Sequence, residues 1–211
     1  MGDQVSSTND LKDRPRSMSD PKVRDERKGM LYLRHIAPLT NYAEELRKAE
    51  LGEVPDFDPL DGGVTAKLLF LFEKPGPKTS PKQGGSGFIS RDNDDPTAEA
   101  TFGFMAQPGI RRDIAVIWNV VPWWNETRKV TGRELREGIR CVRDLITILP
   151  SLEGVVMVGN NAAKAGNYLA ETRLPLFQSF HPSPIVKASA RQKWDSIPSQ
   201  WAGAMAALKG M

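Results

Sequence analysis

The amino-acid sequence predicts an α/β fold, a three-layer α/β/α sandwich whose central sheet has four mostly parallel strands. Apolar runs without a polar helical face indicate strands that are buried on both faces. Such runs occur at 67–72, 114–118, 154–158 and 176–180. Segments with helical character lie between them, and this alternation is typical of a parallel sheet covered by helices.

The intervals between these strands supply the helices. A short charged helix is expected over 42–51, and a second begins at Pro96 and runs to about residue 105. The helix predicted over 131–149 opens with the spacing of a capping box at Thr131, and an apolar stripe follows. A further helix begins at Gly159, directly after the third strand, where backbone amides are also candidates for binding a phosphate.

The composition indicates one sizeable globular domain with an extension. The 211 residues are 39% hydrophobic, and the formal net charge is +3. This mildly basic balance is compatible with a polyanionic partner and equally with an ordinary solvated surface. Residues 1–29 hold almost no large apolar side chain. We therefore expect a disordered tail over 1–29 and a single domain over 30–211.

The pattern of metal-ligating and membrane-spanning residues excludes several classes of protein. Cys141 is the one cysteine, which excludes intramolecular disulfides and cysteine-bound iron–sulfur clusters. No spacing of histidine and acidic residues indicates a metal site, so we expect neither a metal nor another cofactor. We find neither a signal-peptide pattern nor an apolar run long enough to cross a bilayer. We expect a monomeric, cytoplasmic protein.

Three of the predicted strands end in short motifs that carry polar residues and proline. They are Phe72-Glu73-Lys74-Pro75-Gly76-Pro77, Trp118-Asn119-Val120-Val121-Pro122-Trp123 and His181-Pro182-Ser183-Pro184. Carboxyl ends of parallel strands meet at one edge of a sheet, where ligands bind. His181 stands between a strand end and two prolines, which makes it a pre-positioned hydrogen-bond donor. The sequence thus predicts one site built from all three motifs.

The order and spacing of these motifs resemble the uracil-DNA glycosylase superfamily. The resemblance runs from about Lys67 to the C-terminal helix, and the histidine motif is its most specific part. It implies a parallel four-stranded sheet between helices and DNA as the partner. It also implies hydrolysis of the bond that joins a flipped pyrimidine to its sugar.

The resemblance assigns roles to three residues of the expected site. His181 would donate a hydrogen bond to the departing pyrimidine anion. Asn119 would read the base edge with its amide, although an asparagine after a strand also caps turns. Phe88 would stack on the base, and the alternative for Phe88 is a simple loop anchor.

The catalytic carboxylate is where the sequence departs from the best-known members. Those members carry aspartate or asparagine directly before the motif proline, where this chain has Lys74. Glu73 matches the glutamate that some members retain one residue earlier. Asp94 and Asp95 are further candidates, with helix capping as their alternative role. Lys74 itself is expected to contact a DNA phosphate or to form an ion pair.

Gly76 bears on which base is accepted. It stands where some strict uracil enzymes carry a tyrosine that excludes pyrimidines substituted at C5, so the resemblance leaves open uracil or a bulkier C5-modified pyrimidine. Uracil would indicate base-excision repair, and a modified base would indicate defence against phages with modified DNA. The alternative function is a non-catalytic protein of the same fold that binds damaged or single-stranded DNA.

The segment that follows the histidine supplies the expected DNA contacts. Ser183 belongs to the motif, Ile185 is a candidate wedge for pushing the nucleotide out, and Lys187 and Arg191 add positive charge. The alternative is an amphipathic helix with a solvated basic face. The tryptophans are expected mainly as core residues, and Trp123 and Trp124, beside Asn119, are the two considered as DNA contacts.

Overall fold

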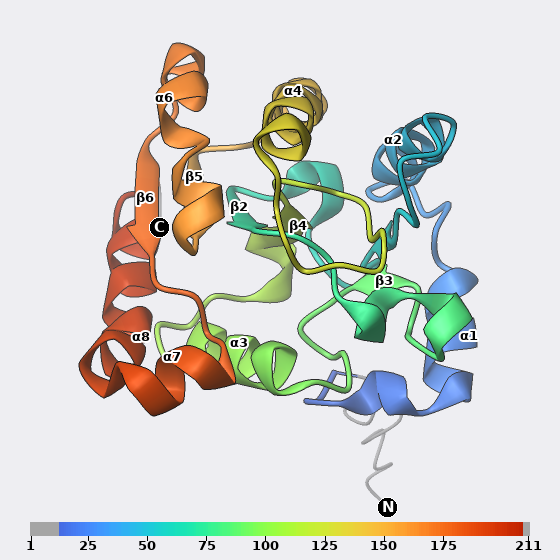
Figure 1. Ribbon diagram of the computed structural model, residues 1–211, viewed down its shortest axis with the longest axis horizontal. Helices are drawn as coiled ribbons and strands as arrows, with labels where there is room; N and C mark the ends of the chain where they lie inside the picture. Colours follow the sequence, from blue (N-terminus) through green and yellow to red (C-terminus); the bar gives the residue numbers. More distant parts are fainter. Residues whose placement is uncertain (1–12, 209–211) are drawn as a thin grey trace, which may run out of the picture.

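The computed structural model describes residues 13–208 and contains a four-stranded, fully parallel sheet flanked by helices (Figure 1). The strand order is β4-β2-β5-β6. The bounds are β2 Leu68–Phe72, β4 Ala115–Asn119, β5 Gly154–Val158 and β6 Leu176–Ser179. The α/β class and the parallel four-stranded sheet predicted from the sequence are confirmed.

Eight α-helices occur in the described residues, and Figure 1 shows them around the sheet. They are α1 Pro21–Lys28, α2 Ala37–Arg47, α3 Pro96–Ala106, α4 Gly132–Thr147, α5 Asn160–Ala163, α6 Gly166–Leu169, α7 Pro184–Ser189 and α8 Arg191–Ala206. The capping box at Thr131 and Glu134 is present. The predicted helix over 42–51 is wrong in its bounds, because the positive φ angles of Glu50 and Gly52 end it early.

The two faces of the sheet are covered by different aromatic side chains. Trp118 of β4 stacks on Phe57 with ring centroids 3.6 Å apart. On the other face, Phe70 of β2 meets Trp201 of α8 edge-on at 5.1 Å. All five residues of β2, β4 and β5 are buried. Phe57 belongs to a small parallel pair, β1 Asp56–Phe57 and β3 Phe88–Ile89, that the sequence did not predict.

The N-terminal segment differs from the disordered tail predicted over 1–29. Residues 1–12 lie outside the described residues, but α1 is a helix capped by Asp20. Arg27 of α1 is buried and pairs with Asp58 and, at 2.7 Å, with Asp92. The prediction of disorder is wrong for residues 13–29, because buried ion pairs hold this segment against the domain. The prediction considered only the small number of apolar residues, and ion pairs cannot be seen from that number. Among the helices of residues 13–208, none combines the length and hydropathy that a membrane span requires.

Candidate active site

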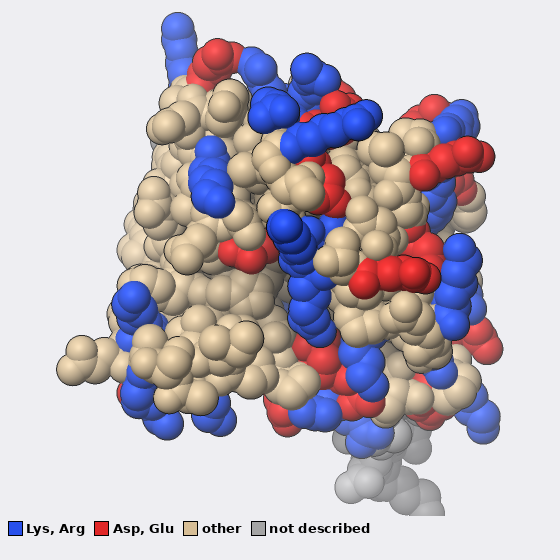
Figure 2. Space-filling model, viewed as in Figure 1, with Lys and Arg blue, Asp and Glu red and all other residues tan. Residues whose placement is uncertain are grey.

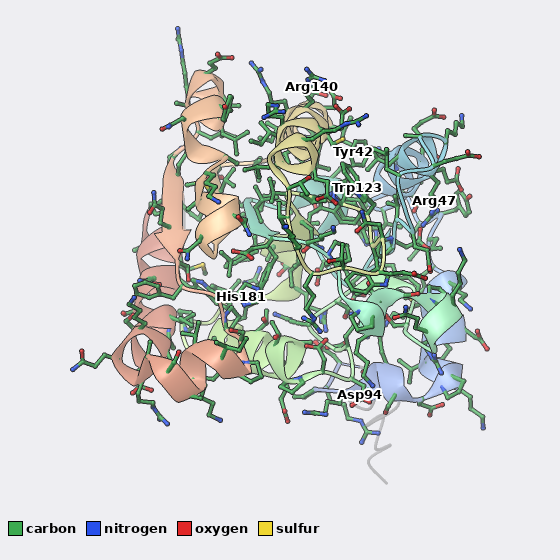
Figure 3. All side chains as sticks on the ribbon, viewed as in Figure 1. Tyr42, Arg47, Asp94, Trp123, Arg140 and His181 are labelled. Carbon is green, nitrogen blue, oxygen red and sulfur yellow. The ribbon has the colours of Figure 1, made fainter. Side chains whose placement is uncertain are left out.

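His181 follows β6 and is held in place by α8 behind it. The indole of Trp201 donates to Ser179 Oγ at 2.8 Å, and the Phe180 amide donates to Gln200 Oε1 at 3.0 Å. The Ser183 amide donates to the His181 carbonyl at 2.8 Å. Figure 3 labels His181 where the chain from β6 enters α7. These contacts fix the backbone on both sides of His181.

The surroundings of His181 keep its imidazole neutral. Phe72 packs edge-on against the ring, with centroids 5.6 Å apart. Burial lowers the pKa of His181, and the positive charge of Arg128 lowers it further, while the carboxylates of Glu73 and Asp95 oppose the shift. A neutral imidazole at pH 7 can donate one hydrogen bond without bringing a positive charge into the site.

Glu73 directly follows β2, and the start of α5 holds its carboxylate. The Asn161 amide donates to Oε1 at 2.8 Å, and the Asn161 side chain donates to Oε2 at 3.3 Å. Gly159 permits this approach, because a Cβ at that residue would lie 2.7 Å from Glu73 Oε1. Of the two interpretations that this turn allows, a phosphate site and an ordinary strand-to-helix turn, the structure agrees with the second, since the Asn161 amide already binds a carboxylate of the chain itself.

Substitution of Gly159 tests how far the site depends on this contact. Gly159→Ala should cost about 1–3 kcal/mol of stability, because φ is +94° there, and it should also displace the Glu73 carboxylate. Urea unfolding measures the loss of stability, and the rate of base release measures the effect of displacing the carboxylate. Gly203→Ala is the matched control, because its added Cβ meets no atom within 4 Å. Equal behaviour of the two variants would contradict the assigned role of Gly159.

Asn119 is the last residue of β4 and pairs in register with Phe72 at the end of β2. Its residue surface is 5% exposed. Within residues 13–208 its side chain makes no hydrogen bond, so the turn-capping alternative is not realised. Although the residue as a whole is buried, the side-chain oxygen and nitrogen of Asn119 stay open to solvent, so a ligand can reach them. Asn119 is therefore available to an incoming polar group at the same sheet edge as His181 and Glu73.

The structure separates the two aspartates predicted near the site. Asp95 caps α3 by accepting from the amides of Thr97 at 2.9 Å and Ala98 at 3.0 Å, and its charge also acts on His181. Asp94 instead pairs with Arg16 at 3.0 Å, and the hydrogen bond from Arg16 lowers the pKa of Asp94. Asp95 thus lies near the site, whereas Asp94 is occupied at the surface.

Phe88 lies in β3 and is completely buried. The Asn93 side chain donates to its carbonyl at 2.8 Å, which ties the strand to the loop that leads to Asp95. This environment agrees with the loop-anchor alternative. Stacking of Phe88 on a base stays a prediction.

Lys74 does not reach the surface, which corrects the predicted phosphate contact. Its side chain is 2% exposed, and Nζ lies 2.7 Å from Glu134 Oε1 and 2.6 Å from Asn125 Oδ1. Burial raises the pKa of Glu134, but hydrogen bonds from Lys74 and Thr131 outweigh burial and bring it to about 2. Lys74 is the ion-pairing residue that the sequence left as an alternative, with a partner the sequence did not identify.

The segment after His181 presents an exposed isoleucine and two restrained cations. Ser183 caps α7 by accepting from the Val186 amide at 3.3 Å. Ile185 is 76% exposed, the highest value among the exposed large hydrophobic residues described. Lys187 lies over the Trp194 ring at 5.4 Å, and Arg191 contacts Asp195 at 2.9 Å.

The paired tryptophans after β4 are buried. Trp123 is 3% exposed and Trp124 is 5% exposed. Both rings pack inside the protein, as the expected core role requires, and neither is placed to contact DNA.

Arg128 belongs to the site, although the sequence did not indicate it. Its guanidinium lies 3.6–3.8 Å from the position that a Cβ on Gly76 would take. The room that the sequence predicted above Gly76 is thus partly filled by a cation. No group of three or more His, Cys, Asp or Glu residues in the described part of the chain is placed to hold a metal ion.

The fold and the site define an α/β protein with a ligand site at the carboxyl edge of its sheet. There, a neutral histidine, a held carboxylate and an asparagine without a partner come from three strand ends. The family model for the uracil DNA glycosylase superfamily matches residues 60–201, and the chain belongs to this superfamily. Members of the superfamily are in general DNA glycosylases. A search of curated proteins found no match.

Proposed function

We propose that this protein is a DNA glycosylase that flips a pyrimidine nucleotide out of DNA and hydrolyses the bond between the base and its sugar. The observation that carries the proposal is the position of His181, a half-buried donor whose pKa is lowered, at the same edge of the sheet as the Glu73 carboxylate. Cleavage of the base–sugar bond creates positive charge on the sugar and negative charge on the base. The Glu73 carboxylate suits the positive charge on the sugar, and the His181 donor suits the negative charge on the base.

Each residue of the site then has a defined part in the reaction. Water supplies hydroxyl to C1′ of the sugar, and the electron pair of the broken bond leaves with the base. His181 donates a hydrogen bond to the base anion, a contribution of about 3 kcal/mol for such a donor. Glu73 stabilises the sugar cation or orients the water, and Asn119 pairs with the polar edge of the flipped base.

Positive charge surrounds this edge of the sheet and favours DNA as the partner. An exposed basic side chain lies after the end of each strand of the sheet, at Lys78, Arg128, Lys164 and Lys187. Figure 2 shows Lys and Arg side chains bordering the shallow hollow above α7. Phosphate contacts by Lys78, Lys164 and Lys187 would position a nucleic acid without reading its sequence.

Ile185 is proposed to fill the gap that the flipped nucleotide leaves in the duplex. Ile185→Ala should lower base release from double-stranded DNA about tenfold, with a much smaller effect on single-stranded DNA, where no stack must be opened. Single-turnover rates on the two substrates measure this. Leu51→Ala, at another exposed apolar residue, is the control. An equal loss on both substrates would contradict the wedge role.

One assay tests the proposed function and the identity of the base. The protein is incubated with DNA oligomers that carry uracil, mismatched thymine, hydroxymethylcytosine or glucosylated hydroxymethylcytosine, and released bases are identified by mass spectrometry. Release of uracil supports a role in repair, and release of a modified cytosine supports defence against phages. DNA retention without release of any base contradicts the proposal and favours the non-catalytic DNA-binding alternative.

A further inference from the structure

Arg128 lies in the loop between β4 and α4, far along the chain from the motif that it contacts. The guanidinium Nη2 atom lies 3.6 Å from the Cβ position at Gly76, and Cζ and Nη1 both lie 3.8 Å from it. Gly76 follows Glu73 after β2, so Arg128 reaches over the strand end that carries the catalytic candidate. The contact distances are those of ordinary packing, which places the cation directly against this motif.

The guanidinium of Arg128 has no carboxylate partner within residues 13–208, although the site contains two carboxylates. Glu73 is held by Asn161, and Asp95 is held by the first amides of α3. Each acid of the site thus already has donors of its own. The charge of Arg128 remains uncompensated and exposed to whatever enters the site.

The charged groups around His181 come from three elements. Glu73 follows β2, Asp95 caps α3 and Arg128 lies in the loop after β4, and all three act electrostatically on the imidazole. Arg128 is the one cation among them. Phe72 packs edge-on against the His181 ring, and Gly76 lies against the Arg128 guanidinium, and both residues belong to the motif at the end of β2. The charge of Arg128 and the hydrogen-bond donor of His181 therefore lie in the same region of the site.

We propose that Arg128 and His181 together form the subsite that stabilises the departing pyrimidine anion. This inference rests on the proposed function and names a second group for its leaving-group step. When the bond from C1′ to the base breaks, the electron pair moves onto the pyrimidine ring and its carbonyl oxygens. His181 can donate one hydrogen bond to that charge, and a guanidinium adds a full positive charge with further donors.

A leaving-group comparison tests the proposal. Single-turnover rates and DNA affinities are measured for the wild type, Arg128→Gln, Arg128→Lys and the control Arg140→Gln. Arg140 is exposed on α4, and Figure 3 shows it far from His181. The substrates carry uracil or 5-fluorouracil, because fluorine stabilises the pyrimidine anion and reduces its need for a cation.

Arg128→Gln should lower the rate on uracil about tenfold, with a distinctly smaller loss on 5-fluorouracil and little change in affinity. Arg128→Lys should recover part of the rate, and Arg140→Gln should behave as the wild type. Equal losses on the two bases, or a loss confined to DNA affinity, would overturn the proposal and indicate a phosphate contact instead.

Nuclear magnetic resonance supplies a readout that needs no turnover. The sequence contains two histidines, so the His181 titration can be resolved. Loss of the nearby positive charge in Arg128→Gln should raise the pKa of His181, and an unchanged titration would overturn the placement of Arg128. Failure of the wild type to release any base, from these substrates or from those of the function assay, would instead contradict the proposed function, and with it the role of Arg128 in base release.

Discussion

Replacement of His181 by alanine should lower the rate of base release by about 10²–10³-fold while DNA binding is largely retained. The reason is that the imidazole donates to charge that develops only in the transition state, and loss of one such donor costs about 3–4 kcal/mol. The variant should fold, because the loop is fixed through Ser179, Phe180 and Ser183 and not through the ring.

Single-turnover kinetics under saturating protein measure this effect, and His35→Ala is the matched control. His35 lies outside the sheet edge, and its ring contacts the Pro59 carbonyl at 3.0 Å. A fall of less than threefold in the His181→Ala rate would show that the leaving base does not depend on the imidazole.

The pH dependence of the wild type follows from the same residue. Burial lowers the pKa of His181 below its ordinary value of 6.5. The neutral form therefore persists at neutral pH, and the rate should be constant above about pH 6.5 and fall below it. An imidazolium would pair with Glu73 and remove the negative charge that the sugar cation needs. A rate that rises steadily as the pH falls from 7 to 5 would contradict a neutral donor.

The largest expected effect on stability belongs to Arg27. Its guanidinium and that of Arg112 share the buried carboxylates of Asp58 and Asp92. Burial raises the pKa of Asp58, but Arg112 and Arg27 outweigh burial and bring it to about 2. Arg27→Met should cost about 3–5 kcal/mol, because it leaves two buried carboxylates with too little positive charge.

Urea unfolding of the full chain measures the Arg27 effect against Arg16→Met. Arg16 also makes ion pairs, but its side chain is 40% exposed, so solvent screens these pairs and their loss should cost distinctly less stability. Similar costs for the two variants would show that the buried pairs contribute no more than surface pairs.

The parts of the fold that the sequence predicted are those that depend on periodicity and strand order. Leu68–Phe72 and Gly154–Val158 are apolar throughout because both faces of the sheet are covered. Parallel pairing then brings Glu73, Asn119 and His181 to one edge. The position of each strand end in the chain was enough to predict that these three residues share a site.

The parts that the sequence missed depend on contacts between loops far apart in the chain. Lys74 meets Glu134, and Arg128 meets Gly76, through the geometry of the loop between β4 and α4. The conformation of such a loop cannot be predicted from the spacing of residues within it. At Gly159 the sequence indicated part of the arrangement, a strand-to-helix turn whose amides can bind an anion. The anion in the structure is the Glu73 carboxylate of the chain itself.

The ion pairs of Arg27 also bear on how this protein can be shortened. Composition places the start of the folded domain at residue 30, and the family match starts at residue 60. A fragment cut at residue 30 would keep every residue of the site and lose the guanidinium that lies between Asp58 and Asp92. It would also lose the hydrogen bond from the Met18 amide to the Asp92 carbonyl. The smallest fragment that folds therefore begins before residue 30, and so also before residue 60, where the family match starts.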